Sequence, residues 1–226
     1  PNPSASSASI DKLAPGHEPI SRNEEVARSE AADSSDRLES TLVERARRGE
    51  DASFAELVRR YERKLLRILE RFVRDREHAR DLAQETFLRV HQKLDRFDPA
   101  KRFGPWLFRI GVNLALDSLR RQKLVRGREL PLRIDRSSDG EPGDSSEFEP
   151  TVPDPRELVE LAQEVEHVLQ SIPLPIRTVL ILRDLEGIAS SEVAAIIGKR
   201  EATVRWRLAQ GRQRFRELWE VRHPLD

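Results

Sequence analysis

Apolar residues recur at three- and four-residue spacing over most of the chain, as they do in helices that each bury one face. The longest such stretch contains Phe54, Leu57, Val58, Tyr61, Leu65, Ile68, Leu69 and Phe72. A second, from about residue 77 to 94, places Ala79, Leu82, Ala83, Phe87 and Val90 on one side. No segment shows the sustained alternation of a half-buried strand. The pattern predicts an all-α protein.

Glycine and proline indicate where these helices begin and end. Gly49 is expected to end a first helix that begins near residue 38. Pro105 is expected to open a fourth helix, because proline suits the first helical position. Farther along, Pro175 opens another helix, and Gly198 supplies the left-handed residue that ends the helix starting near Ser190.

Two segments lack helical spacing. Residues 1–37 are rich in Ser, Ala, Pro and acidic groups, so we expect a disordered extension. Residues 122–156 contain several prolines and glycines and have the composition of a flexible, acidic linker. The predicted organisation is therefore two small helical domains, residues 38–121 and 157–226, joined by that linker.

Composition removes several classes of function. The chain has no cysteine, which excludes disulfides, thiolate catalysis and Cys-ligated zinc. Its five histidines are scattered, and it contains no Gly-rich phosphate loop and no nucleophile elbow. No apolar run approaches the roughly 20 residues that span a bilayer. We therefore expect no enzyme activity, no metal, no cofactor and no membrane span.

The segment from Asp184 to Arg216 has the form of a helix-turn-helix with a basic second helix. From about Glu201, one side of that helix carries Val204, Leu208, Gly211 and Phe215, and the opposite side carries Ala202, Arg205, Trp206, Ala209, Gln210 and Gln213. Arginine contacts phosphates or guanine, and glutamine pairs with adenine. The pattern predicts major-groove binding, although a basic amphipathic helix in an ordinary bundle has the same spacing.

Two further segments carry candidate surfaces. In HARDLAQETFLRVHQKL, a polar stripe with one leucine consists of Asp81, Gln84, Glu85 and Leu88. Such a stripe suits a protein partner, but spacing alone favours an ordinary solvated face. In RFGPWLFRIGVNLALDSLRR and the loop before it, Phe97, Phe103, Trp106 and Phe108 lie beside Lys101, Arg102 and Arg109. This is the composition of a single-strand DNA surface, unless the aromatics are core and the cations solvated.

Taken in order, the strings DLAQETFLRV, WLFRIGVNLALDSLRR and IPLPIRTVLILRDLEGIASSEVAAIIGKREATVRWRL resemble a bacterial RNA polymerase sigma factor of the extracytoplasmic-function (ECF) class. Residues 38–121 correspond to sigma region two and residues 157–226 to sigma region four. The resemblance implies a protein that binds core RNA polymerase and directs promoter-specific initiation. Region two would open and read the minus-ten element, and region four would read the minus-thirty-five element.

The resemblance also implies site residues. Core polymerase binding falls on Asp81, Leu82, Gln84, Glu85, Phe87 and Leu88. The minus-ten set is Phe97, Lys101, Arg102, Phe103, Trp106, Arg109, Asn113, Asp117 and Arg120. The minus-thirty-five set is Lys199, Arg200, Thr203, Arg205, Trp206, Arg207, Gln210 and Arg212. Arg200, Ala202, Trp206 and Gly211 depart from the usual family pattern, so the upstream promoter sequence does not follow from relatives.

The implied partners are core RNA polymerase (clamp helices and flap), promoter DNA and an anti-sigma factor, in the bacterial cytoplasm. A hypothesis is that acidic linker residues mimic RNA phosphates in the polymerase channel, namely Asp135, Asp139, Glu141, Asp144, Glu147 and Glu149. Two other functions fit the residues: a conventional dimeric helix-turn-helix regulator that acts without core polymerase, and a helical scaffold without a DNA role. The first would bind duplex DNA alone.

Overall fold

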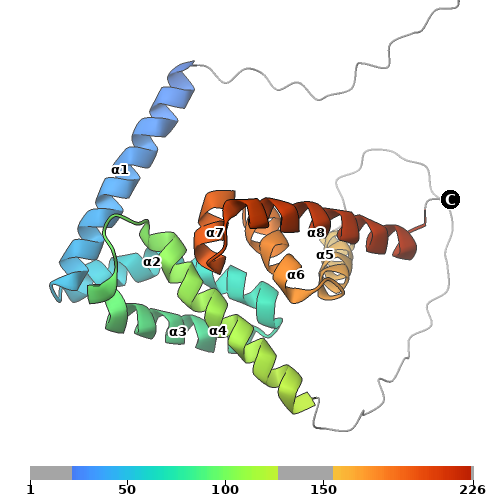
Figure 1. Cartoon of the computed structure of the whole chain (residues 1–226). Coiled ribbons are helices and arrows are strands. Elements are labelled where there is room, and N and C mark those ends of the chain that lie inside the picture. The colour runs from blue at the N-terminus through green and yellow to red at the C-terminus, as the bar shows by residue number, and fades with distance from the viewer. Residues whose placement is uncertain (1–21, 127–154, 225–226) are drawn as a thin grey trace, which may run out of the picture. The chain divides into compact units, whose positions relative to one another are not determined.

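The computed structural model describes residues 22–126 and 155–224, and every regular element in these two stretches is helical (Figure 1). The first stretch contains α1 (Arg22–Arg47), α2 (Asp51–Val73), α3 (Arg76–Lys93), the short 3-10 turn η1 (Leu94–Arg96) and α4 (Phe103–Arg126). The second contains α5 (Pro155–Gln170), α6 (Leu174–Leu180), the π-helical turn η2 (Ile181–Leu185), α7 (Ser190–Ile197) and α8 (Glu201–Arg222). The all-α prediction is confirmed.

Some helix bounds differ from those expected. Helix α1 begins at Arg22, inside the segment expected to be disordered, and α4 continues to Arg126, past the expected domain end at Arg121. Most of the expected linker and its acidic residues lie outside the described residues. The chain divides into two units, residues 1–41 and residues 42–226.

The turn between α2 and α3 shows how local sequence sets the helix ends. Helix α2 ends at Arg74, whose φ of 59° is left-handed and whose N–H bonds the carbonyl of Glu70. Asp75 then caps α3, because its carboxylate accepts the backbone N–H groups of Glu77 and His78 at 2.9 and 3.1 Å. Aspartate is among the residues best suited to this position. One residue ends α2 and the next begins α3.

Helices α2, α3 and α4 pack on one another around a core in which several large side chains are fully buried. Leu65, Ile68 and Leu69 of α2 have no exposed surface, and neither has Leu107 of α4. Helix α4 approaches α2 closely at Gly111, where an added Cβ would lie 2.8 Å from Leu65 Cδ1. The side chains between these three helices are therefore tightly packed, and α4 needs a glycine at its closest approach to α2.

In the second stretch, the close contact is between α6 and α8. An added Cβ at Gly211 of α8 would lie 2.9 Å from Leu180 Cγ and 3.0 Å from Ile176 Cγ2. The sequence pattern placed Gly211 on the inward side of its helix but gave no reason for a residue without a side chain there. The structure gives it a packing reason, since a larger residue fits only if the side chains of Leu180 and Ile176 move.

Helix α7 packs against α4, so the two groups of helices share a core (Figure 1). Ile188, Val193 and Ile196 are buried in the same cluster as the side chains of α2, α3 and α4. A smaller cluster around Leu169, Ile172 and Leu180 belongs to α5 and α6.

Candidate nucleic-acid and polymerase interfaces

An open apolar groove runs between α2 and α3. Its walls include Phe54, Val58 and Leu66 from α2 and Phe87 and Leu88 from α3. Leu88 is 58% exposed, which is unusual for a large apolar side chain beside other apolar surface. The groove therefore presents apolar surface suited to a protein partner.

The residues expected to bind polymerase divide into two groups in the structure. Asp81, Gln84 and Leu88 are exposed, and Gln84 and Leu88 line the groove. Glu85 is half-buried and pairs with Arg89 at 2.6 Å along the same helix. Leu82 is only 6% exposed and belongs to the core, so it supports this surface from below and does not form part of it.

The aromatic side chains expected to stack on single-stranded DNA are mostly core. Phe97 and Phe103 are buried, and their ring centroids lie 5.7 Å apart. Trp106 is half-buried with its ring centroid 5.0 Å from that of Phe97, and Tyr61 of α2 contacts Phe103 at 5.5 Å. In this conformation Phe97 and Phe103 hold the loop before α4 and are not accessible to a base. Phe108 is buried as well.

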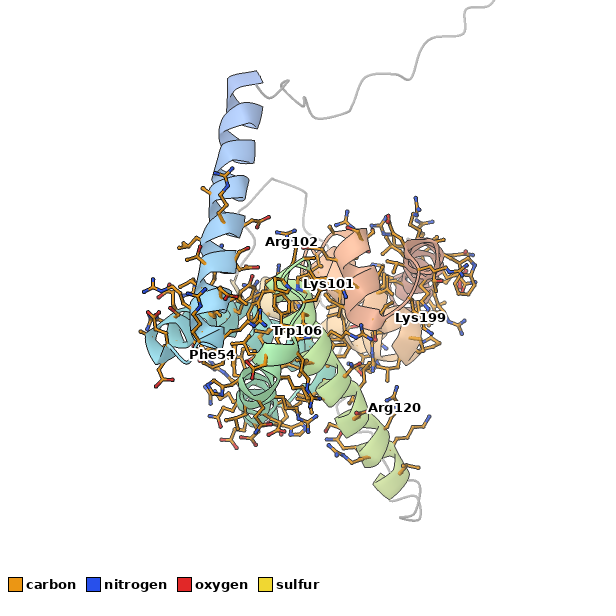
Figure 2. The ribbon with its side chains drawn as sticks, turned by 60° about the vertical axis from the view of Figure 1, so that its left-hand side comes forward. Phe54, Lys101, Arg102, Trp106, Arg120 and Lys199 are labelled. Atoms are coloured by element: carbon orange, nitrogen blue, oxygen red, sulfur yellow. The ribbon has the colours of Figure 1, made fainter. Side chains whose placement is uncertain are left out.

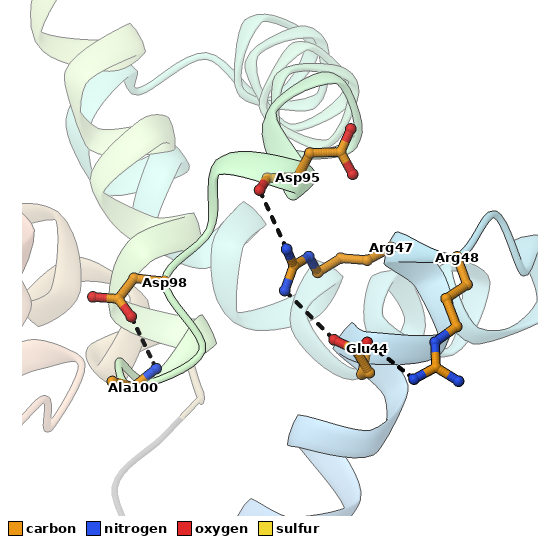
Figure 3. A network of polar contacts seen from close by, with 6 residues as sticks. All are labelled: Glu44, Arg47, Arg48, Asp95, Asp98 and Ala100. Atoms are coloured by element: carbon orange, nitrogen blue, oxygen red, sulfur yellow. Dashed lines mark hydrogen bonds and ion pairs between the residues drawn. The ribbon is translucent and has the colours of Figure 1, made fainter.

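Polar contacts tie the same loop at both ends (Figure 3). Arg47 donates to the backbone carbonyl of Asp95 at 3.4 Å and pairs with Glu44. Asp98 accepts the N–H of Ala100 at 3.1 Å and pairs with Lys101 at 3.3 Å. The hydrogen bond from Ala100 and then the cation of Lys101 hold the pKa of Asp98 below its usual value. The loop is therefore held both by contacts among its own residues and by Arg47 of α1.

Exposed cations surround the loop and continue along α4. Lys101 and Arg102 lie near Trp106, and Arg120 lies farther along α4 (Figure 2). Arg109 and Asn113 are exposed on the same helix. Asp117 pairs with Arg120 at 2.6 Å. The predicted minus-ten set is thus a solvated row of cations over a buried aromatic support.

The helix-turn-helix is present as α7 and α8. Gly198 has the left-handed φ of 63° that was predicted, and α8 starts three residues later, at Glu201. Arg205, Trp206 and Gln210 are exposed, and Trp206 is 57% exposed. Val204 and Gly211 are buried. The inward and outward faces of α8 therefore follow the sequence pattern, and Lys199 lies at the turn (Figure 2).

The cations of α8 are not equivalent. Arg212 makes a two-point ion pair with Asp184, with nitrogen–oxygen distances of 2.9 and 2.7 Å, and this bond raises the pKa of Arg212. Arg207 is half-buried and donates to the carbonyl of Pro175 at 3.5 Å, and Thr203 is half-buried too. Sequence spacing gave no signal for the Arg212 pair, because its partner is 28 residues away.

Sequence reasoning also missed a buried ion pair. The side chain of Glu186 is 1% exposed and contacts Arg71 at 2.9 Å and Arg67 at 3.3 Å, both from α2. Glu186 lies in the short non-helical segment between η2 and α7, where an acidic residue would ordinarily be solvated. Only the folded chain brings the two arginines to it.

The described residues offer no metal site, since no three His, Asp or Glu side chains among them are arranged to hold an ion. Across the same two stretches, no helix combines the length and the apolar character needed to cross a bilayer.

Comparison with known proteins gives the family. Residues 57–125 match the model of sigma-70 region 2, and residues 162–215 match that of sigma-70 region 4. The RNA polymerase sigma-H factor of Pseudomonas aeruginosa is 32% identical over 175 residues, which cover 76% of this chain and 89% of that one. The ECF RNA polymerase sigma-E factor of Escherichia coli K12 is 33% identical over 180 residues, with the same coverage of 76% and 89%.

Solved structures show the same fold. The structure of CnrH in complex with the cytosolic domain of CnrY superposes with a TM-score of 0.60 at 25% identity and covers 81% of this chain and 98% of that one. The sigma factor RpoE of Bartonella quintana, solved with the anti-sigma factor NepR, gives a TM-score of 0.54 at 22% identity and covers 74% of this chain and 97% of that one. By its two matched regions, its relatives and its fold, the chain belongs to the family of RNA polymerase sigma factors, in the ECF class.

Proposed function

We propose that this sigma factor directs core RNA polymerase to promoters through three separate surfaces, with no catalysis of its own. Polymerase supplies the chemistry, in the bacterial cytoplasm, and this chain supplies the choice of sequence and the opening of the strands. Residues 38–121 act as region two and residues 157–226 as region four. The proposal rests on one combined observation. The chain matches both sigma regions, and the same regions expose an apolar groove suited to a protein and cations suited to DNA.

The groove between α2 and α3 is proposed to receive the polymerase clamp helices. It offers apolar surface at Phe87 and Leu88, with Gln84 and Asp81 beside it as polar contacts. An apolar groove with a polar rim is the kind of surface that binds a helical partner. Leu82 supports this surface from the core, and Glu85 supports it through its ion pair with Arg89 on the same helix.

The cation row beside the loop is proposed to hold the opened minus-ten strand. Lys101, Arg102 and Arg109 neutralise phosphates, and the half-buried Trp106 offers an aromatic face to a base. Asn113, Asp117 and Arg120 extend the surface along α4. Phe97 and Phe103 set the position of the loop and do not contact DNA themselves.

Helix α8 is proposed to read the minus-thirty-five element in the major groove. Arg205, Trp206 and Gln210 face outward, where they reach base edges. Lys199, Arg200 and Arg207 contact the phosphates that fix the register of the helix. Arg212 is held by its ion pair with Asp184, and its proposed role is to keep α8 in position for these phosphate contacts. An anti-sigma factor, like the partner of the Bartonella relative, covers the polymerase-binding surfaces.

Run-off transcription with purified core polymerase and a promoter library tests the proposal. We expect transcripts only when the chain is added, from promoters that share two sequence elements. The variant Leu88→Asp should lose activity because it places a charge in the groove, whereas Leu124→Asp, which makes the same change at an exposed leucine of α4 outside the groove, should keep it. If core polymerase gives no specific transcripts and the chain alone binds duplex DNA as a dimer, the proposal is wrong.

A further inference from the structure

The three tryptophans of the chain are supported in different ways. Trp106 and Trp219 are half-buried, and their ring centroids lie 5.0 Å from that of Phe97 and 5.8 Å from that of Phe215. Trp206 of α8 is 57% exposed and belongs to neither apolar cluster of the described residues. Tryptophan is enriched at the centres of interfaces, because its large ring gains much from burial. Trp206 is therefore a candidate contact with another molecule.

The helix surface around Trp206 leaves its ring uncovered. Ala202 and Ala209 lie four residues before and three residues after it, so they are its neighbours on the helix surface, and both are exposed. Their methyl side chains are too short to cover an indole. With α8 in the major groove, Trp206 therefore projects from the helix toward the base edges.

The charges around Trp206 favour a polyanion as the partner. Lys199, Arg200 and Arg205 are exposed and lie within about two helical turns before it. Glu201 is the one acidic residue in the sequence from 199 to 216, and its carboxylate lies 4.0 Å from the guanidinium of Arg205. An aromatic ring among cations fits a base edge flanked by phosphates, because the cations hold the backbone while the ring meets the base.

The chemistry of the indole selects among the four bases. Its one polar group is an N–H, which donates a hydrogen bond and cannot accept one. Adenine and cytosine each present an amino donor in the major groove, and an indole would remove that donor from water without offering it an acceptor. Guanine presents acceptors but no apolar group, whereas thymine presents the O4 acceptor with a C5-methyl group beside it. Thymine therefore fits best.

We propose that Trp206 selects a thymine in the minus-thirty-five element, by packing its indole against the C5-methyl group in the major groove. The inference deepens the role proposed above for α8 and rests on it. Arg205 and Gln210, exposed on the same side of the helix, supply hydrogen bonds to neighbouring base edges. Trp206 adds an apolar contact that reads a methyl group.

Uracil substitution in the DNA tests this contact without any change in the protein. Uracil keeps the hydrogen-bonding edge of thymine but lacks the C5-methyl group. Promoter duplexes selected by run-off transcription are prepared with each thymine of the upstream element, on either strand, replaced by uracil in turn. Their affinity is measured for the full chain bound to core polymerase. We expect about fourfold weaker binding at one position, which is the change that burial of a single methyl-sized group produces.

Variants of α8 assign that position to Trp206. In Trp206→Ala the uracil and thymine duplexes should bind equally, because the methyl group has lost its partner. Trp206→Gln, which keeps a long side chain without the ring, should lose the difference as well. Val221→Ala trims an 83% exposed side chain near the end of α8, outside the proposed interfaces, and should keep the fourfold difference. Circular dichroism shows whether each variant is folded.

Three results would overturn the inference. They are an upstream element with no thymine on either strand, a full set of uracil duplexes that all bind like their thymine parents, and a uracil effect that persists in both Trp206→Ala and Trp206→Gln. In each case, promoter-specific transcription by the unsubstituted chain would leave the proposed function standing. The absence of specific transcripts would instead remove the proposed function, and this inference with it.

Discussion

The loop before α4 and the outer face of α8 both present exposed cations, but the chain supports them in different ways. The loop rests on Phe97 and Phe103, which are buried in the main core and contact Tyr61 and Trp106. Over its 22 residues, α8 buries only Val204 and Gly211. In the loop, therefore, the residues that set stability and those proposed to face DNA are interleaved. On α8 they occupy opposite faces, and one set can change without the other.

The largest expected effect is on the aromatic support. Phe103→Ala should lower the free energy of unfolding by about 3–5 kcal/mol, because it leaves a cavity under the loop. Trp206→Ala on α8 should change it by no more than about 0.5 kcal/mol, since that side chain is exposed. Urea denaturation of the full chain measures both. Similar losses in the two variants would remove the contrast between loop and helix.

A smaller effect is expected where α8 meets α6. Gly211→Val should destabilise the chain by about 1–3 kcal/mol, because its side chain overlaps Leu180 and Ile176. Ala209→Val adds a β-branched side chain to the same helix at an exposed position and should cost only about 0.5 kcal/mol. Thermal unfolding compares the pair, and a more stable Gly211→Val chain would contradict the packing argument.

On the reading face, changes should affect promoter choice and leave stability alone. Arg205→Ala should reduce use of specific promoters by about 1–3 kcal/mol at one base position. Arg200→Ala removes one exposed charge just before α8, at a residue proposed to contact phosphate, so it should weaken all promoters alike and reduce the salt slope by about 1. Transcription from promoters mutated base by base distinguishes them. An equal loss on every promoter for Arg205→Ala would count against base reading.

The smallest effect concerns the loop alone. Because the pKa of Asp98 is lowered in the folded chain, its contribution to stability is present at neutral pH and is lost as pH falls through that lowered pKa. Asp98→Ala should speed hydrogen exchange at the Ala100 amide at neutral pH, and the difference should vanish in strong acid.

Asp95→Ala is the control for that prediction, since Asp95 takes part in the loop contacts of Figure 3 through its backbone carbonyl. Its Ala100 amide should exchange as in the unsubstituted chain at every pH. Faster exchange there would mean that the loop depends on general charge and not on the Asp98 cap.

Much of the fold followed from the sequence because the apolar spacing is strong. The apolar positions from Phe54 to Phe72 lie within α2, and the predicted helix from residue 77 to 94 agrees with α3 to within about one residue at each end. The left-handed Gly198 was also predictable, since glycine has no Cβ to oppose a positive φ. Helix α1 before residue 38 was not, because few apolar residues there mark a buried face.

The sequence predicted which types of residue form each surface, but it did not predict which residues contact one another. Spacing separated Arg205 and Trp206 from the buried face of α8, since helical periodicity alone decides that. It could not assign Arg212 to Asp184 or Glu186 to Arg71, because those partners meet only when distant segments pack together. Nor could it show that Phe97 and Phe103 lie inside the core, since the same letters fit a stacking surface.

Residues Ile181–Leu185 form a π-helical turn, which holds one residue more than an α-helical turn of the same kind. Because one such turn covers about the same rotation as an α-helical turn, it takes up its extra residue without changing the direction of the helices on either side. Deleting a single residue there would give an α-helical turn and leave α7 and α8 in nearly their present orientation to α6. Deleting a residue within α6 would instead rotate everything downstream by about 100° and move Glu186 away from its arginines. Chain length is therefore constrained more tightly in α6 than in the π-helical turn that follows it.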